Sequence, residues 1–229
     1  MPEIVARGPL SLSIFRWKGL RNIAHYLVCV SICCLLFLLW AAPGMAQSFD
    51  DAIAAYQRHD YAKALSLFEA LGNQGNVEAQ HNAGHMYNLG IGTKPNLTQA
   101  MAWYRRAADQ GFAPSQYDLG IMYAEGEGVK ADAKTALFWF RKAAEQGFVD
   151  AEVKLAEVSF ASQDYKQAFF WWQKAADVGD AGAMFNVASA YYAGRGVPKD
   201  EAKAIEYYRK ARDAGHPEAE RILKQLNAD

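Results

Sequence analysis

Cysteine is scarce in this sequence, and its placement removes several classes of function. The chain of 229 residues has three cysteines, Cys29, Cys33 and Cys34, all in an apolar stretch near the amino terminus. None of them has the small-residue neighbours that a lipoprotein cysteine requires. Residues 47–229 therefore hold no thiol for a disulfide, a cysteine nucleophile or a metal–thiolate site.

Apolar runs of membrane-spanning length are missing as well. The uncharged run from Leu27 to Ala42 has 16 residues, whereas a spanning helix needs about 20. Four basic residues precede this run, and the small residues Gly44 and Ala46 follow it. Such a pattern is typical of a secretory signal peptide. We therefore predict that residues 1–46 are a signal peptide, cleaved after Ala46, and that the protein is periplasmic or secreted. The alternative is an uncleaved signal that anchors it to the inner membrane.

The sequence also has no surplus of basic residues. It carries 24 Lys and Arg against 25 Asp and Glu, and residues 1–46 contain four of these bases and one of these acids. The remainder has a net charge of about −4 and no basic run. Nucleic-acid-binding domains carry a basic patch or stripe, so we expect no nucleic-acid partner. After signal cleavage we also expect no stable membrane insertion.

What the sequence does contain is self-similarity. An aromatic pair begins at Trp103, Trp139, Trp171 and Tyr207, at steps of 36, 32 and 36 residues. A fixed period of this size indicates a repeat architecture. Three further columns keep the same register: Gly75, Gly111, Gly147, Gly179, Gly215; Ala64, Ala100, Ala136, Ala168, Ala204; and Asp60, Asn96, Asp132, Asp164, Asp200.

Each column has a physical interpretation. Asp or Asn before an apolar run is a typical helix N-cap, and the glycine column matches the left-handed residue that ends a helix. The residues between them carry apolar positions at helical spacing. A preceding helix in each unit has a small residue, such as Gly84 or Gly120, that lets the two helices approach closely. Each unit is therefore predicted to be a pair of antiparallel helices.

A paired-glycine loop links the two helices of the longer units. The copy at 126–128 fits a loose dinucleotide-binding pattern, but similar glycine pairs recur at 90–92 and 194–196. No strand precedes the loop, as the dinucleotide fingerprint requires. We interpret the loop as a joint between helices. The units at 47–77 and 150–181 lack it and are four residues shorter, which accounts for the single 32-residue step.

The pattern A…LG.MY..G.GV..D..KA..WY.KAA.QG resembles the Sel-1-like repeat family, the extended relatives of tetratricopeptide repeats. Full-length copies occupy 78–113, 114–149 and 182–217, whereas 47–77 and 150–181 resemble plain tetratricopeptide units. The resemblance implies an all-α, right-handed superhelix, or solenoid, of stacked antiparallel helix pairs. It also implies use as a protein-binding scaffold.

The last residues, 218–229, are predicted to form a C-terminal capping helix. Ala219, Ile222, Leu223 and Leu226 recur at helical spacing, and charged residues occupy the opposite side. Terminal repeats need such a polar outer face. The five repeats are therefore predicted to end in a cap.

One pair of residues raises the possibility of metal chemistry. His81 and His85 share a helix face at a spacing that can hold a metal. The zinc-peptidase version needs Glu after the first His, and here that residue is Asn82. The counterparts of these histidines in the other repeats differ, so we predict no metal, no cofactor and no catalytic residue. The alternative function is a cell-envelope hydrolase or a cell-wall ligand-binding protein.

The face formed by the first helices of the repeats is the predicted partner surface. In tetratricopeptide-like packing, defined first-helix positions face the concave side, and exposed aromatic residues there favour binding hot spots. We predict that this groove binds a partner protein or peptide in the envelope, with Tyr117 and Phe185 as anchors. Its predicted residues are His81, His85, Asn88, Leu89, Tyr117, Ile121, Glu125, Val153, Glu157, Phe160, Phe185, Ser189 and Tyr192.

Overall fold

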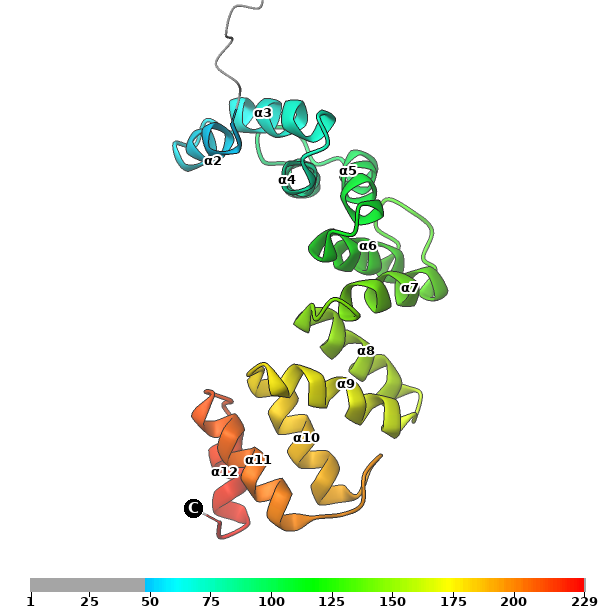
Figure 1. The fold of residues 1–229 in the computed structure, drawn as a ribbon, viewed down its shortest axis with the longest axis vertical. Helices are drawn as coiled ribbons and strands as arrows, with labels where there is room; N and C mark the ends of the chain where they lie inside the picture. Colours follow the sequence, from blue (N-terminus) through cyan, green and yellow to red (C-terminus); the bar gives the residue numbers. More distant parts are fainter. Residues whose placement is uncertain (1–47, 229) are drawn as a thin grey trace, which may run out of the picture. The chain divides into compact units, whose positions relative to one another are not determined.

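The computed structural model describes residues 48–228, which form a succession of α-helices (Figure 1). The predicted signal peptide lies outside the described residues. Within them, no helix has the length and apolar character needed to cross a membrane. The helices are α2 (Phe49–Gln57), α3 (Tyr61–Asn73), α4 (Val77–Leu89), α5 (Leu97–Asp109), α6 (Ala113–Glu125), α7 (Ala133–Ala144), α8 (Val149–Ala161), α9 (Tyr165–Asp177), α10 (Ala181–Ala193), α11 (Glu201–Asp213) and α12 (Ala219–Gln225).

Each helix packs on its neighbours in the chain. The pairs α2–α3, α4–α5, α6–α7, α8–α9 and α10–α11 form the units, and the second helix of each unit packs on the first helix of the next. Helix α12 packs on α11, where Leu223 is fully buried. The predicted all-α solenoid of helix pairs with a C-terminal cap is therefore confirmed.

The Asp/Asn column begins the second helices, as predicted, with one exception. The side chain of Asn96 accepts a hydrogen bond from the backbone N–H of Gln99, and Asp132 accepts from two N–H groups of its first turn. Asp60 also occupies the N-cap of α3, but its side chain accepts no helix N–H. Asp164 has a similar main-chain ψ, 70° against 65°, yet its side chain accepts from the N–H of Gln167, so main-chain geometry does not explain the difference. The side-chain cap predicted at this one position is wrong.

The glycine column ends these helices in the left-handed conformation. After α3, Gly75 has φ of 97°. Its N–H donates to the Gly72 carbonyl, and the N–H of Asn76 donates to the Leu71 carbonyl. These two bonds form a Schellman motif, which satisfies carbonyls that the helix end leaves free.

Close approach of the paired helices depends on the small residues of the first helix. A Cβ atom on Gly84 would lie 2.8 Å from Cδ1 of Tyr104, and one on Gly120 would collide with the Phe140 ring. The aromatic ring of each second helix therefore occupies the space that a larger side chain would need. The predicted role of this column is confirmed.

The paired-glycine loops link the two helices of each long unit, and they also pack against the unit before it. A Cβ on Gly92 would lie 2.5 Å from the Tyr61 carbonyl oxygen, and one on Gly196 would collide with the Tyr165 carbonyl oxygen. Both glycines have φ of 76°. The loops are thus joints, as predicted. The two short units instead turn through a non-glycine residue with φ of 63°, His59 or Gln163.

Candidate functional site

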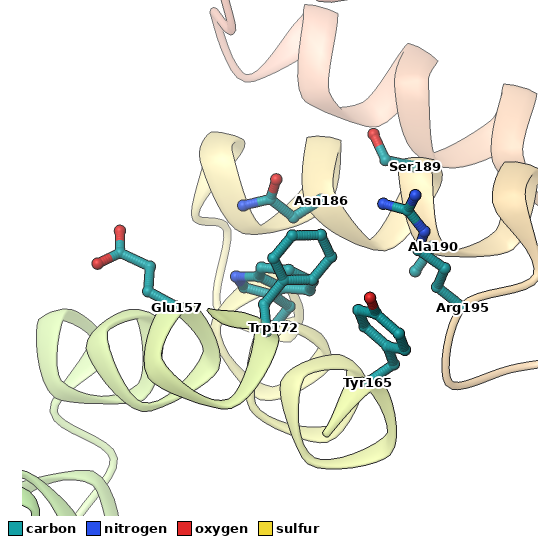
Figure 2. Close-up of a pocket in the computed structure, with 8 residues that line it drawn as sticks. Glu157, Tyr165, Trp172, Asn186, Ser189, Ala190 and Arg195 are labelled. Atoms are coloured by element: carbon teal, nitrogen blue, oxygen red, sulfur yellow. The ribbon is translucent and has the colours of Figure 1, made fainter. Parts of the chain in front are cut away.

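A cavity of about 350 Å³ opens between α8, α9 and α10 (Figure 2). It lies where the short unit 150–181 meets the following long unit. Three of its lining residues, Glu157, Phe160 and Ser189, belong to the predicted groove. The full lining is Glu157 and Phe160 from α8, Tyr165 and Trp172 from α9, Asn186, Ser189 and Ala190 from α10, and Arg195 from the loop after α10.

Aromatic rings form the apolar wall of this cavity. Phe160 lies edge-on to Tyr165, with ring centroids 5.3 Å apart, and its centroid is 5.4 Å from that of Trp172. Trp172 is only 7% exposed, whereas Phe160 is 37% exposed. A large aromatic side chain that remains open to solvent in a concave site supplies apolar contact area for a ligand.

Opposite charges stand at the two ends of the cavity. In Figure 2, Glu157 and Arg195 lie at opposite ends, with Trp172 between them. The guanidinium carbon of Arg195 is 5.7 Å from the ring centroids of both Phe160 and Tyr165. Within residues 48–228, Arg195 forms no ion pair, whereas Glu157 accepts a hydrogen bond from Lys154 at 3.0 Å. The rings therefore hold one cation that has no carboxylate partner.

The polar side chains on α10 differ in whether they already make hydrogen bonds within the protein. The Ser189 hydroxyl donates to the Phe185 carbonyl at 3.0 Å and lies 3.0 Å from the Tyr208 hydroxyl. Burial raises the pKa of Tyr208, so this phenol stays protonated at neutral pH. The Asn186 side chain, in contrast, makes no hydrogen bond within the described part of the chain. Its amide can therefore donate to, or accept from, a bound group.

The predicted anchor residues are partly packed inside their own repeats. The ring of Tyr117 lies 5.6 Å from that of Phe140 and 5.4 Å from that of Phe148. Phe185 stacks on His216 with centroids 4.2 Å apart. Both rings are half-buried, so a charge placed at either position would disturb folding as well as any bound partner.

The predicted groove residues differ in their exposure. Six are exposed: His85, Leu89, Glu125, Glu157, Phe160 and Tyr192. Tyr192 also borders a second cavity, of about 250 Å³, together with residues of α11 and α12. The others are partly buried: His81, Asn88, Tyr117, Ile121, Val153, Phe185 and Ser189.

His81 is part of a partly buried polar cluster between α4 and α6. Its Nδ1 lies 3.0 Å from Oγ of Ser115 and 3.5 Å from a carboxylate oxygen of Asp118. Burial, and secondly the neighbouring His85, lower the pKa of His81 to about 4. Burial raises the pKa of Asp118 to about 7. Between these two values both side chains favour their uncharged forms.

This cluster does not have the geometry of a catalytic triad. Serine and aspartate contact opposite ring nitrogens of a triad histidine, whereas Ser115 and Asp118 both approach Nδ1 of His81. Ser115 is also fully buried. His81 and His85 have ring centroids 6.5 Å apart, and residues 48–228 contain no set of three His, Cys, Asp or Glu placed to hold a metal. The contacts of this cluster instead join α4 to α6.

Stacked antiparallel helix pairs, joined by glycine loops and capped at the end, define a helical-repeat solenoid. The Sel1 repeat model matches residues 54–76, 77–112, 113–148, 151–180 and 181–216. The chain belongs to the Sel1 repeat family. Proteins built from these repeats typically mediate protein–protein interactions, and the scaffold is generally non-catalytic.

Two solved structures illustrate this relationship. A Sel1 repeat protein from Oxalobacter formigenes is 33% identical over 78% of this chain and 74% of its own, with a TM-score of 0.71. A protective antigen present in uropathogenic Escherichia coli strains, which displays an SLR fold, is 35% identical with a TM-score of 0.64. That match covers 68% of this chain and 34% of the antigen, so this chain spans about a third of the antigen's length. No curated protein matches the chain significantly.

Five cavity residues were missed by the sequence analysis. They lie on the second helix, in the loop, or at first-helix positions outside the chosen columns. One signal was present: Ala190 is small where the corresponding first-helix residues are Met86, Met122 and Val158. The missed residues are Tyr165, Trp172, Asn186, Ala190 and Arg195.

Proposed function

We propose that this protein is an exported interaction scaffold that binds a partner protein or peptide on the face formed by its first helices, α4, α6, α8 and α10. The observation that carries the proposal is the open, aromatic-walled cavity between α8 and α10. Three predicted groove residues border it, and Phe160 exposes over a third of its surface there. A volume of about 350 Å³ falls in the range of ligand sites. Side chains of a bound peptide would fill it.

The proposal contains no catalytic step. Among residues 48–228, the cluster with hydrolase-like residue types, around His81, is partly buried and has the wrong contacts at the histidine. No observation on the described residues favours the hydrolase alternative. Binding alone accounts for an apolar cavity with a few convergent polar groups.

Export is the part of the proposal that rests on residues 1–46. A basic flank, a short apolar core and small residues before position 47 support it. Amino-terminal sequencing of the protein recovered from the envelope should begin at Gln47. A full-length species that stays in the membrane after a carbonate wash would favour the anchored alternative.

Site-specific photocrosslinking tests which face binds. A benzophenone amino acid would replace His85 or Glu157, which are exposed on the first helices, in full-length protein expressed in its host. Matched controls would replace Phe138 or Phe170, which are exposed on the second helices α7 and α9. We expect a discrete crosslinked partner from the first-helix positions only. Crosslinks from the second-helix positions alone would place the working surface on the other face.

A further inference from the structure

We infer that the cavity between α8 and α10 recognises an internal acidic segment of the partner, in which a large apolar side chain is followed by Asp or Glu. This inference rests on the proposed function. The apolar side chain fills the cavity against Phe160 and Trp172, and the carboxylate binds Arg195. The site thus selects its peptide by a combination of apolar burial and charge.

The chemistry of the cavity supports a carboxylate at one end only. Arg195 has no ion pair within residues 48–228, and its guanidinium lies 5.7 Å from two ring centroids that limit its freedom. A planar guanidinium binds carboxylate through paired N–H donors. At the opposite end, Glu157 is already paired with Lys154 at 3.0 Å and repels a second carboxylate. The two ends therefore favour one direction of the peptide.

A second junction of three helices in the same chain, which has the same backbone arrangement but a filled interior, shows that the fold alone does not produce this cavity. The junction of α2, α3 and α4 repeats the same arrangement 104 residues earlier, as Tyr61 and Tyr165 or Gly92 and Gly196 show. There the corresponding residues belong to one hydrophobic cluster. The pairs are Phe160 and Tyr56, Tyr165 and Tyr61, Trp172 and Phe68, Ala190 and Met86, and Arg195 and Ile91.

The earlier junction supplies the substitutions that test the inference. Ala190→Met introduces the side chain that fills the equivalent position and should close the cavity. Arg195→Gln removes the charge but keeps a long polar side chain that can donate a hydrogen bond. Both changes leave the aromatic pair of Phe160 and Tyr165 in place. Because Met86 is accommodated at the matching position, we expect Ala190→Met to fold, and its melting temperature checks this.

The probes are short synthetic peptides with blocked ends, titrated into the ¹⁵N-labelled protein and followed through the indole N–H signal of Trp172. We expect Gly-Phe-Asp-Gly to bind about three- to fivefold more tightly than Gly-Phe-Asn-Gly, because an exposed charge pair contributes modestly. Arg195→Gln should abolish this preference but retain binding. Gly-Ala-Asp-Gly should bind far more weakly, and Ala190→Met should remove binding of all of them.

Several outcomes would overturn the inference. Equal binding of the Asp and Asn peptides would remove the role of the carboxylate. A preference confined to Gly-Gly-Phe with a free carboxyl end would replace the internal segment by a chain terminus. Should Ala190→Met fail to fold, Phe160→Ala, which removes the aromatic wall, takes its place. If first-helix photocrosslinks persist while no peptide prefers the acid, this inference fails and the scaffold function stands. If the crosslinks are absent too, both fail.

Discussion

The two short units of this solenoid show how one backbone arrangement produces either a sealed core or an open site. In both, an aromatic pair from the end of the first helix and the start of the second lies edge-on. The centroids are 5.2 Å apart for Tyr56 and Tyr61 and 5.3 Å for Phe160 and Tyr165. At the first junction Met86 and Ile91 fill the adjacent space. At the second, Ala190 and Arg195 stand in their places and leave a cavity.

The difference teaches that openness here depends on side-chain volume rather than on loop length. Both units lack the glycine loop of their own, and in both the loop of the following unit packs against the start of the second helix. A tightly packed interior excludes ligands because it has few voids. Among the side chains that differ between the two junctions, Ala190 is much smaller than its counterpart Met86, and the cavity opens beside it.

The joint glycines common to both junctions should give the largest effect. Gly196→Ala places a Cβ against the Tyr165 carbonyl oxygen at positive φ, so we expect a loss of about 3–5 kcal/mol in the free energy of unfolding. Gly179→Ala is the matched control, because it shares a positive φ but has open space around the new Cβ. It should cost only about 1–2 kcal/mol. Equal losses in the two variants would show that the close contact is unimportant. Urea denaturation measures both.

Opening the sealed junction should have the next largest effect. Met86 is 1% exposed, so Met86→Ala should leave a cavity and cost about 2–4 kcal/mol. The reverse change, Ala190→Met, should alter stability by less than about 1.5 kcal/mol because it fills space that is already open. Similar losses in both variants would mean that the two junctions are not equivalent. Thermal unfolding by circular dichroism compares them.

The junction of α4, α5 and α6 extends the comparison, because its stability should depend on pH. Asp118 corresponds to Asn82 and Asn186 at the two short-unit junctions. Burial raises its pKa from 3.8 to about 7, so its contribution to stability falls as pH rises through this range. Burial and His85 lower the pKa of His81 from 6.5 to about 4, so its contribution rises with pH over that range. The two trends oppose each other between about pH 4 and pH 6.5.

Single variants should reveal each trend. In Asp118→Asn only the histidine remains, and stability should increase from pH 4 to pH 6.5 by about 1–2 kcal/mol. In His81→Gln only the carboxyl remains, and stability should decrease from pH 4 to pH 7 by a similar amount. Urea unfolding at several pH values measures both slopes. Parallel profiles in the two variants would contradict the assignment.

The smallest effect is expected at the tight turns of the two short units. His59 and Gln163 both have φ of 63°, which glycine adopts without a Cβ penalty. Gln163→Gly should raise the free energy of unfolding by up to about 1 kcal/mol. The gain at His59→Gly should be smaller, because Nδ1 of His59 lies 2.7 Å from the Tyr61 hydroxyl and that contact is lost. A loss at Gln163→Gly would mean that the side chain, not the backbone, holds the turn.

The fold could be predicted from the sequence because the same local signals recur in each repeat. N-caps, left-handed glycines and small helix-contact residues recur in register, so a single ambiguous position such as Asp60 does not obscure the pattern. The candidate site was predicted only in part. Glu157, Phe160 and Ser189 follow from helix periodicity.

The rest of the site depends on events that periodicity does not encode. Arg195 reaches the cavity because the loop of one unit packs on the preceding unit, and Trp172 enters it from the second helix. The cavity exists because Ala190 is smaller than its counterparts. Whether a missing volume is filled by neighbouring side chains or left open is a property of the three-dimensional packing.

The glycine loops also set the mechanical character of the array. Three loops reach back to the preceding unit, through Gly92, Gly128 and Gly196. The unit 150–181 has no glycine loop, so the interface between α7 and α8 lacks the loop contact that the long units make with the unit before them. In a linear array each repeat unit is coupled only to its neighbours. The interface with the weakest coupling is therefore the one at which neighbouring units separate first. We therefore expect force applied to the two ends to separate the array first at the interface between α7 and α8. The cavity and its three helices, α8, α9 and α10, should then stay together in the C-terminal part.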